Sequence, residues 1–170
     1  MENNTFYYDK PEIPQELPRI EGFLEDDIRA FVGAYADKYI ERFRRIANGE
    51  KPYSWSCAIF LTYWMAYRKM VKPAILFTFM LGLINRTIPG FNFWLQMMCH
   101  FILILFYFVY MGREGNVLYW NFVKETLTKE GLADISQPDY NKRAALGRKG
   151  GTSLLYLFVF IVLSSMISSL

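Results

Sequence analysis

The sequence predicts an all-α membrane protein with about three transmembrane helices, one re-entrant or interfacial aromatic helix and two amphipathic cytoplasmic helices. The first observation behind this prediction is segment 91–111, whose 21 residues carry no charged side chain. As a helix it would rise about 31 Å, enough to cross the hydrocarbon core of a bilayer. The second is that 53% of the residues are hydrophobic, although the mean hydropathy is only +0.10. Strongly apolar segments must therefore alternate with strongly polar ones.

Length, charge and cysteine content limit the possibilities further. The 170 residues suggest one compact unit. The formal net charge is only +3, but basic residues stand beside apolar runs, where a cytoplasmic leaflet would attract them. Cys57 and Cys99 lie in apolar sequence without the spacing of a disulfide framework or metal site, so we expect buried, reduced thiols. We expect no secretory signal peptide, because the first 50 residues contain no apolar h-region.

The N-terminal region divides into a tail and a helix. Residues 1–22 contain Pro11, Pro14 and Pro18 without periodicity, and predict a flexible tail in front of a single membrane domain over 23–170. Residues 23–49 predict an amphipathic helix, because apolar side chains recur at helical spacing. Those side chains are Ile28, Phe31, Val32, Tyr35, Tyr39, Ile40, Phe43 and Ile46. Either the basic end of this helix meets lipid headgroups or a partner, or its apolar face packs on the protein's own membrane core.

The aromatic segment 53–67 allows two arrangements. As a helix it would be about 22 Å long, which is short for a span. Arg68, Lys69 and Lys72 follow it, and each cation would cost roughly 2.5–3.5 kcal/mol at the bilayer centre, so they should mark an interface. Either the segment crosses as a short span, or it enters and returns or lies flat at the surface.

The positive charges favour the re-entrant or interfacial arrangement. Residues 112–151 hold many basic side chains, whereas 85–92 hold only Arg86, and the positive-inside rule places the more basic loop in the cytoplasm. The resulting topology has a cytoplasmic N-terminus, an outward span at 71–88, a return span at 91–111 and a final span at 152–170 that ends outside. Segment 71–88 is short and would need tilt or local thinning of the bilayer.

The loop over 112–151 predicts a second amphipathic helix. Apolar residues recur at helical spacing over 116–129, with Asn116 as N-cap and Gly131 as stop. We expect this helix to lie at the membrane surface against the first one, followed by a loop with a helical turn or two around 140–146. The serines at 164, 165, 168 and 169 either let a neighbouring helix approach closely or bond back to carbonyls of their own helix.

Three short motifs stand in a characteristic order. They are Tyr67-Arg68-Lys69-Met70 after the aromatic segment, Gly115-Asn116-x-Leu118-Tyr119-x-x-x-Val123 far downstream, and Gly150-Gly151-Thr152-Ser153 before the last apolar run. In this order and spacing, over about residues 31–165, the chain resembles bacterial domain-of-unknown-function family 2628. The resemblance implies a small bacterial inner-membrane protein without established activity, and offers Tyr67, Arg68, Lys69, Gly115, Asn116, Tyr119, Gly150, Gly151 and Thr152 as motif or interface residues. Phe122 departs from the family pattern, which usually has histidine there.

Candidate chemistry is sparse. His100 is the single histidine and, with Gln96, gives the central span its polar side chains. An ionisable residue inside a membrane is a functional hypothesis by default. Cys99 is its neighbour, but adjacent helical positions point about 100° apart, so the two cannot face one another. We expect a neutral, packed His100, no catalytic or metal site, no cofactor and no enzymatic activity. The basic residues flank membrane segments and do not form a nucleic-acid footprint.

Two functional classes remain at this stage. The first is an interaction or scaffold protein that presents its cytoplasmic helices and tail to a partner. The second is an oligomeric pore or transport component, holin-like in character. A pore usually places polar or ionisable groups along a span, and here they are few. The expected partners are the lipid bilayer and either another protein or further copies of the chain.

Overall fold

The computed structural model describes residues 17–87, 92–133 and 139–169. Its elements are β1 (Arg19–Ile20), β2 (Phe23–Leu24), α1 (Glu25–Val32), α2 (Ala36–Ala47), α3 (Trp55–Tyr67), α4 (Val71–Thr87), α5 (Phe93–Lys129), α6 (Tyr140–Lys149) and α7 (Leu154–Ser169). Helices dominate, as predicted. Residues 1–16 of the predicted tail lie outside the described part of the chain.

A small hairpin precedes the first helix, so the prediction of a purely helical fold with a tail to residue 22 was wrong at this point. Strands β1 and β2 pair antiparallel, with Ile20 opposite Phe23. Glu21 and Gly22 between them have φ of 48° and 87°, the positive values that a two-residue hairpin turn requires. The Glu21 carboxylate accepts hydrogen bonds from Trp120 Nε1 at 3.2 Å and Lys124 Nζ at 2.7 Å. These bonds fasten the hairpin to α5.

The amphipathic segment 23–49 forms two helices where one was predicted. Gly33 ends α1 with φ 67°, a conformation that costs glycine nothing and other residues 1–2 kcal/mol. The predicted apolar face is nonetheless buried, because Ile28, Phe31 and Val32 of α1 and Tyr39, Ile40 and Phe43 of α2 are nearly inaccessible. It packs within the protein rather than on lipid.

Helix α5 is continuous over 37 residues, so the predicted span 91–111 and the predicted helix 116–129 share one helix, and the predicted N-cap at Asn116 was wrong. Its first 18 residues, 93–110, are mostly exposed and apolar, whereas Met111, Tyr119, Trp120, Val123 and Leu127 are fully buried. The surroundings change although the helix backbone is unbroken. Asn116 lies inside the helix, and its side-chain amide donates a tertiary hydrogen bond to Pro52 O at 2.8 Å.

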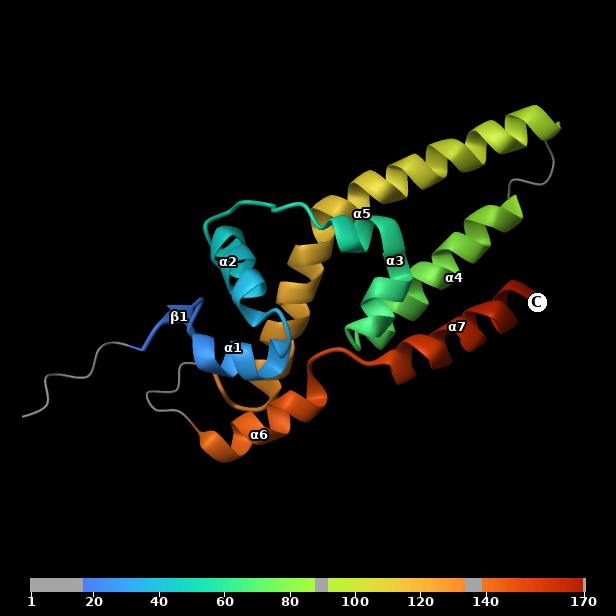
Figure 1. Cartoon of the computed structure of the whole chain (residues 1–170). Coiled ribbons are helices and arrows are strands. Elements are labelled where there is room, and N and C mark those ends of the chain that lie inside the picture. The colour runs from blue at the N-terminus through green and yellow to red at the C-terminus, as the bar shows by residue number, and fades with distance from the viewer. Residues whose placement is uncertain (1–16, 88–91, 134–138, 170) are drawn as a thin grey trace, which may run out of the picture.

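The buried half of α5 forms the core of a helical domain, which we define as α1, α2, α6 and residues 111–129 of α5 (Figure 1). The Phe43 and Trp120 rings stack with centroids 4.5 Å apart. Helix α6 closes the domain over α1, where Arg143 pairs with the fully buried Asp27 and with Asp26. Phe31 and Leu146 add apolar contact from both sides.

The exposed half of α5, α4 and α7 extend away from this domain on its other side (Figure 1). Two helical stretches, Phe93–Lys129 and Asn141–Met166, are long and apolar enough to cross a membrane, the second including the short turn between α6 and α7. Only 6% and 17% of their most apolar windows are buried, which is the opposite of a soluble core helix. The described apolar part of α4, Val71–Ile84, is shorter, so the predicted third span is not confirmed.

Helix α3 joins the two parts of the molecule. It contacts α4, α5 and α7, and its direction changes at Leu61, where φ is 47° and ψ is −123°. The loop before α3 is hydrogen-bonded to α5. Ser54 N donates to Gly112 O at 2.7 Å, and Tyr53 Oη donates to Phe108 O at 3.2 Å. Groups that hydrogen-bond to the carbonyls of a helix compete with its i→i−4 hydrogen bonds and bend it. Figure 1 shows α5 changing direction where it meets α3.

Candidate functional site

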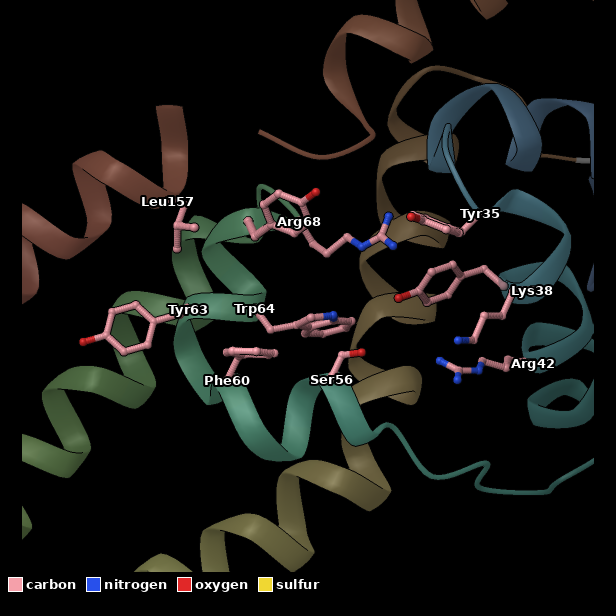
Figure 2. Close-up of a pocket in the computed structure, with 11 residues that line it drawn as sticks. Tyr35, Lys38, Arg42, Ser56, Phe60, Tyr63, Trp64, Arg68 and Leu157 are labelled. Carbon is pink, nitrogen blue, oxygen red and sulfur yellow. The ribbon is translucent and has the colours of Figure 1, made fainter. Parts of the chain in front are cut away.

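A cavity of about 410 Å³ lies between α2, α3 and the first turn of α7. Figure 2 shows side chains entering it from both walls. It is lined by Tyr35, Lys38, Tyr39, Arg42, Ser56, Phe60, Tyr63, Trp64, Tyr67, Arg68 and Leu157. Six of these eleven residues are tyrosine, tryptophan or phenylalanine, and none is acidic. The lining is therefore aromatic and cationic.

Arg68 is the most unusual side chain of the lining, because it is charged and only 4% exposed. Its guanidinium carbon lies 4.4 Å from the centre of the Tyr39 ring and 5.2 Å from that of Tyr119. Its Nε and Nη1 atoms are buried without a hydrogen-bond partner. Contacts with the rings offset part of the free-energy cost of burying a cation. They leave two strong donors without an acceptor, and burying such donors unpaired costs further free energy.

Lys38 and Arg42 reach the cavity from the opposite wall. They stand four residues apart on α2, so they share one helix face, and both extend toward α3 while Arg68 extends toward α2 (Figure 2). Among the described residues, no carboxylate forms an ion pair with Lys38, Arg42 or Arg68. Three formal positive charges therefore converge on one cavity without compensation.

Residues of the second motif hold these cations in place. Arg42 Nη1 donates to Asn116 Oδ1 at 3.2 Å, and Asn116 is itself fixed by Pro52 O. Tyr119 lies beneath Arg68, and burial raises the pKa of its hydroxyl to about 12 although the nearby guanidinium lowers it. The Tyr119 hydroxyl makes no hydrogen bond of normal geometry. It therefore stays neutral and does not compensate the charge of Arg68.

The end of α3 is attached to the link between α6 and α7. Lys69 Nζ donates to Arg148 O at 2.8 Å, and Ser153 N donates to Tyr67 O at 2.9 Å. Arg68 was predicted, with Lys69 and Lys72, to mark a membrane interface, which stays a prediction. Within the protein Arg68 is buried, because the aromatic rings of α2 and α5 cover its guanidinium.

Glycines of the motifs allow backbones to approach closely. A Cβ at Gly150 would lie 2.0 Å from Phe31 O, and Gly151 N donates to the same oxygen at 2.7 Å. A Cβ at Gly115 would lie 2.6 Å from Cys57 Sγ, which sits on α3 below the cavity wall. Thr152 is half-buried in the link. The three motifs, which are far apart in sequence, are thus in contact, since Tyr119 lies against Arg68 and Ser153 N donates to Tyr67 O, and the first of them lines the cavity.

The intramembrane polar residues do not join this site. His100 and Gln96 are half-buried on the exposed half of α5, and the His100 Nδ1 atom lies 2.8 Å from the Gln96 backbone oxygen one turn earlier. This contact is local to one helix. No group of three potential metal ligands occurs among the described residues.

Several lining residues escaped the sequence analysis as site residues, namely Tyr35, Lys38, Tyr39, Arg42, Ser56, Phe60, Tyr63, Trp64 and Leu157. Tyr39 was assigned to the apolar face of the helix over 23–49, and Arg42 belongs to the basic end of that helix. The spacing of Lys38 and Arg42 was a usable signal, because it places two cations on one helix face next to that apolar face. The position of Arg68 across the cavity from them was not predictable from spacing.

Fold and site define a helical protein with two candidate membrane spans and a cationic, aromatic-walled cavity. Comparison with protein-family models, curated proteins and solved structures finds no match for the chain. The resemblance to family 2628 therefore stays a prediction.

Proposed function

We propose that the chain is a non-enzymatic integral membrane protein that acts as an interaction or scaffold component. The observation that carries this proposal is the division of α5, which is lipid-exposed in character over 93–110 and the core of the helical domain over 111–129. A helix of this kind holds a folded domain directly against the bilayer surface. Such a domain offers partners a surface of fixed position and orientation.

The exposed apolar surface supports residence in a membrane. Large apolar side chains that are more than 40% exposed occur along α4, α7 and the first half of α5, and soluble monomers rarely expose contiguous apolar surface of this kind. We propose three spans, with α4 as the third, and a cytoplasmic helical domain by the positive-inside rule. We further propose a bacterial inner membrane and a C-terminus outside, from the family resemblance and the same topology.

The groups gathered at the cavity favour binding over catalysis. Arginine, lysine and aromatic rings recognise anions and planar groups, whereas general acid–base chemistry needs a group that titrates near neutral pH. The cavity lining contains neither histidine nor carboxylate. The Tyr119 hydroxyl, beneath Arg68 and outside the lining, has its pKa raised by burial, away from that range.

Purification in an uncharged mild detergent, with native mass and identification of co-purifying proteins in one experiment, tests the proposal. A stable complex with one other protein is the expected result. A homo-oligomer of six or more copies that also releases dye from liposomes would replace the scaffold by the pore or transport alternative. A monomer that neither binds protein nor permeabilises liposomes would contradict both.

A further inference from the structure

The cavity has two chemically different ends. At the end formed by α2, Lys38, Arg42 and Arg68 supply three cationic groups, and two donors of Arg68 are buried there without a partner. At the end formed by α3 and α7, the lining is Phe60, Tyr63 and Leu157 (Figure 2). A ligand that satisfies both ends is an amphiphile with an anionic head and an apolar body.

The apolar end opens toward the surface that faces lipid. Phe60 is 59% exposed, and its neighbour Ile59 on α3 and Leu154 and Leu155 at the start of α7 are similarly exposed. Tyrosine and tryptophan side chains, including Tyr63 and Trp64, border this opening, and such residues are typical of headgroup depth. The cationic end lies at the polar helical domain. The cavity therefore spans the boundary between headgroups and acyl chains.

Arg68 identifies the kind of anion. A guanidinium presents a planar fork of donors that matches the oxygens of a phosphate. Its Nε and Nη1 atoms are buried without a partner, so a phosphate that displaced part of their cover and accepted from both would remove the cost of burying them unpaired. Lys38 and Arg42 add charge from the facing wall, as clamps on phosphate groups generally do.

We propose that this cavity binds the phosphate headgroup of an anionic phospholipid, with the phosphate at Arg68, Lys38 and Arg42 and an acyl chain along Phe60, Tyr63 and Leu157. This goes beyond the proposed scaffold function, because lipid would bind whether or not the helical domain has a protein partner. The shared chemistry is a phosphate oxyanion, which could also come from free phosphate. The apolar end of the cavity favours the lipid.

The test uses the full chain in dodecyl maltoside, with thermal unfolding followed by intrinsic fluorescence. Three additions are compared: dioctanoyl phosphatidylglycerol, dioctanoyl phosphatidylcholine and inorganic phosphate. We expect phosphatidylglycerol to raise the midpoint in a saturable way, and the other two to shift it by less than a quarter as much at the same concentration. If both lipids shifted the unfolding midpoint equally, preference for an anionic headgroup would be refuted. If inorganic phosphate alone gave the full shift, the ligand would be free phosphate and not a lipid.

Variants connect the effect to the cavity. Lys38→Gln combined with Arg42→Gln should weaken phosphatidylglycerol binding about tenfold or more, because two charge-assisted contacts are lost. Arg45→Gln is the control for loss of a positive charge from the same helix: it removes one charge, and Arg45 pairs with Glu50 outside the cavity. Arg68→Lys keeps the charge and loses the fork, and should also weaken binding in a protein that remains folded by circular dichroism. Equal affinities of the double variant and the Arg45→Gln control would refute the site.

Discussion

Gly150 and Gly147 lie three residues apart, and the same substitution at each should change stability in opposite directions. A Cβ at Gly150 would lie 2.0 Å from Phe31 O and 2.8 Å from Phe31 C. Both atoms belong to the backbone, so they can yield only if α1 moves away from the α6–α7 link. At Gly147 the nearest atom to an added Cβ is Ala30 O at 3.6 Å, an ordinary contact.

The magnitude follows from two terms. Overpacking costs about 1–3 kcal/mol, and separation of the link from α1 also weakens the hydrogen bond from Gly151 N to Phe31 O, worth about 1 kcal/mol. Gly150→Ala should therefore destabilise by about 2–4 kcal/mol. Gly147→Ala should stabilise by about 0.5–1 kcal/mol, because alanine is the better residue inside a helix.

Thermal unfolding of both variants in one detergent and at one scan rate measures the difference. One kcal/mol shifts the midpoint by about 2–4 °C for a chain of this size, so Gly150→Ala should lower it by roughly 5–15 °C and Gly147→Ala raise it by a few degrees. If the two substitutions produced equal midpoints, the close approach of the link to Phe31 would be refuted.

Three further predictions concern other parts of the molecule. His100→Ala should leave insertion and helix content unchanged, because the hydrogen bond of the His100 ring, to Gln96 O, lies within its own helix; a loss of folded protein by circular dichroism would contradict this. In a Cys99→Ala background, Cys57 should resist maleimide at pH 8 until denaturant is added, because burial raises its pKa to about 12 and leaves about one thiolate in 10⁴; labelling of the folded protein within minutes would be the contrary result. Gly115→Leu should prevent folding or lower the midpoint by more than Gly82→Leu, since an added Cβ meets Cys57 at 2.6 Å in the first case and nothing within 4 Å in the second.

Hydropathy predicted the helices but not all of their ends. The apolar run ends at Met111, where the side chains pass from an exposed apolar surface to the core of the helical domain. The helix backbone continues through this change. Asn116 was mistaken for an N-cap because its amide serves a tertiary contact with Pro52. The break at Gly33, by contrast, has a local cause in a glycine with φ 67°, and it could have been predicted.

The candidate site was predictable only in part. The motif residues Tyr67, Arg68 and Tyr119 were singled out and lie together at the cavity. Lys38 and Arg42 were not, because their direction depends on the turn between α1 and α2 and on the face that α2 presents to α5. That orientation is set by long-range packing such as Phe43 on Trp120, which no local pattern encodes.

The order of segments in the helical domain has a consequence for biosynthesis. Phe43 and Trp120 stack in its core, yet α4 and the apolar half of α5 are made between them. At about 5–20 residues per second, the 77 positions from 43 to 120 take about 4–15 s to translate. These two apolar segments therefore leave the ribosome before the domain can close, so in the proposed topology insertion precedes folding of the domain, and an isolated N-terminal fragment would lack its core.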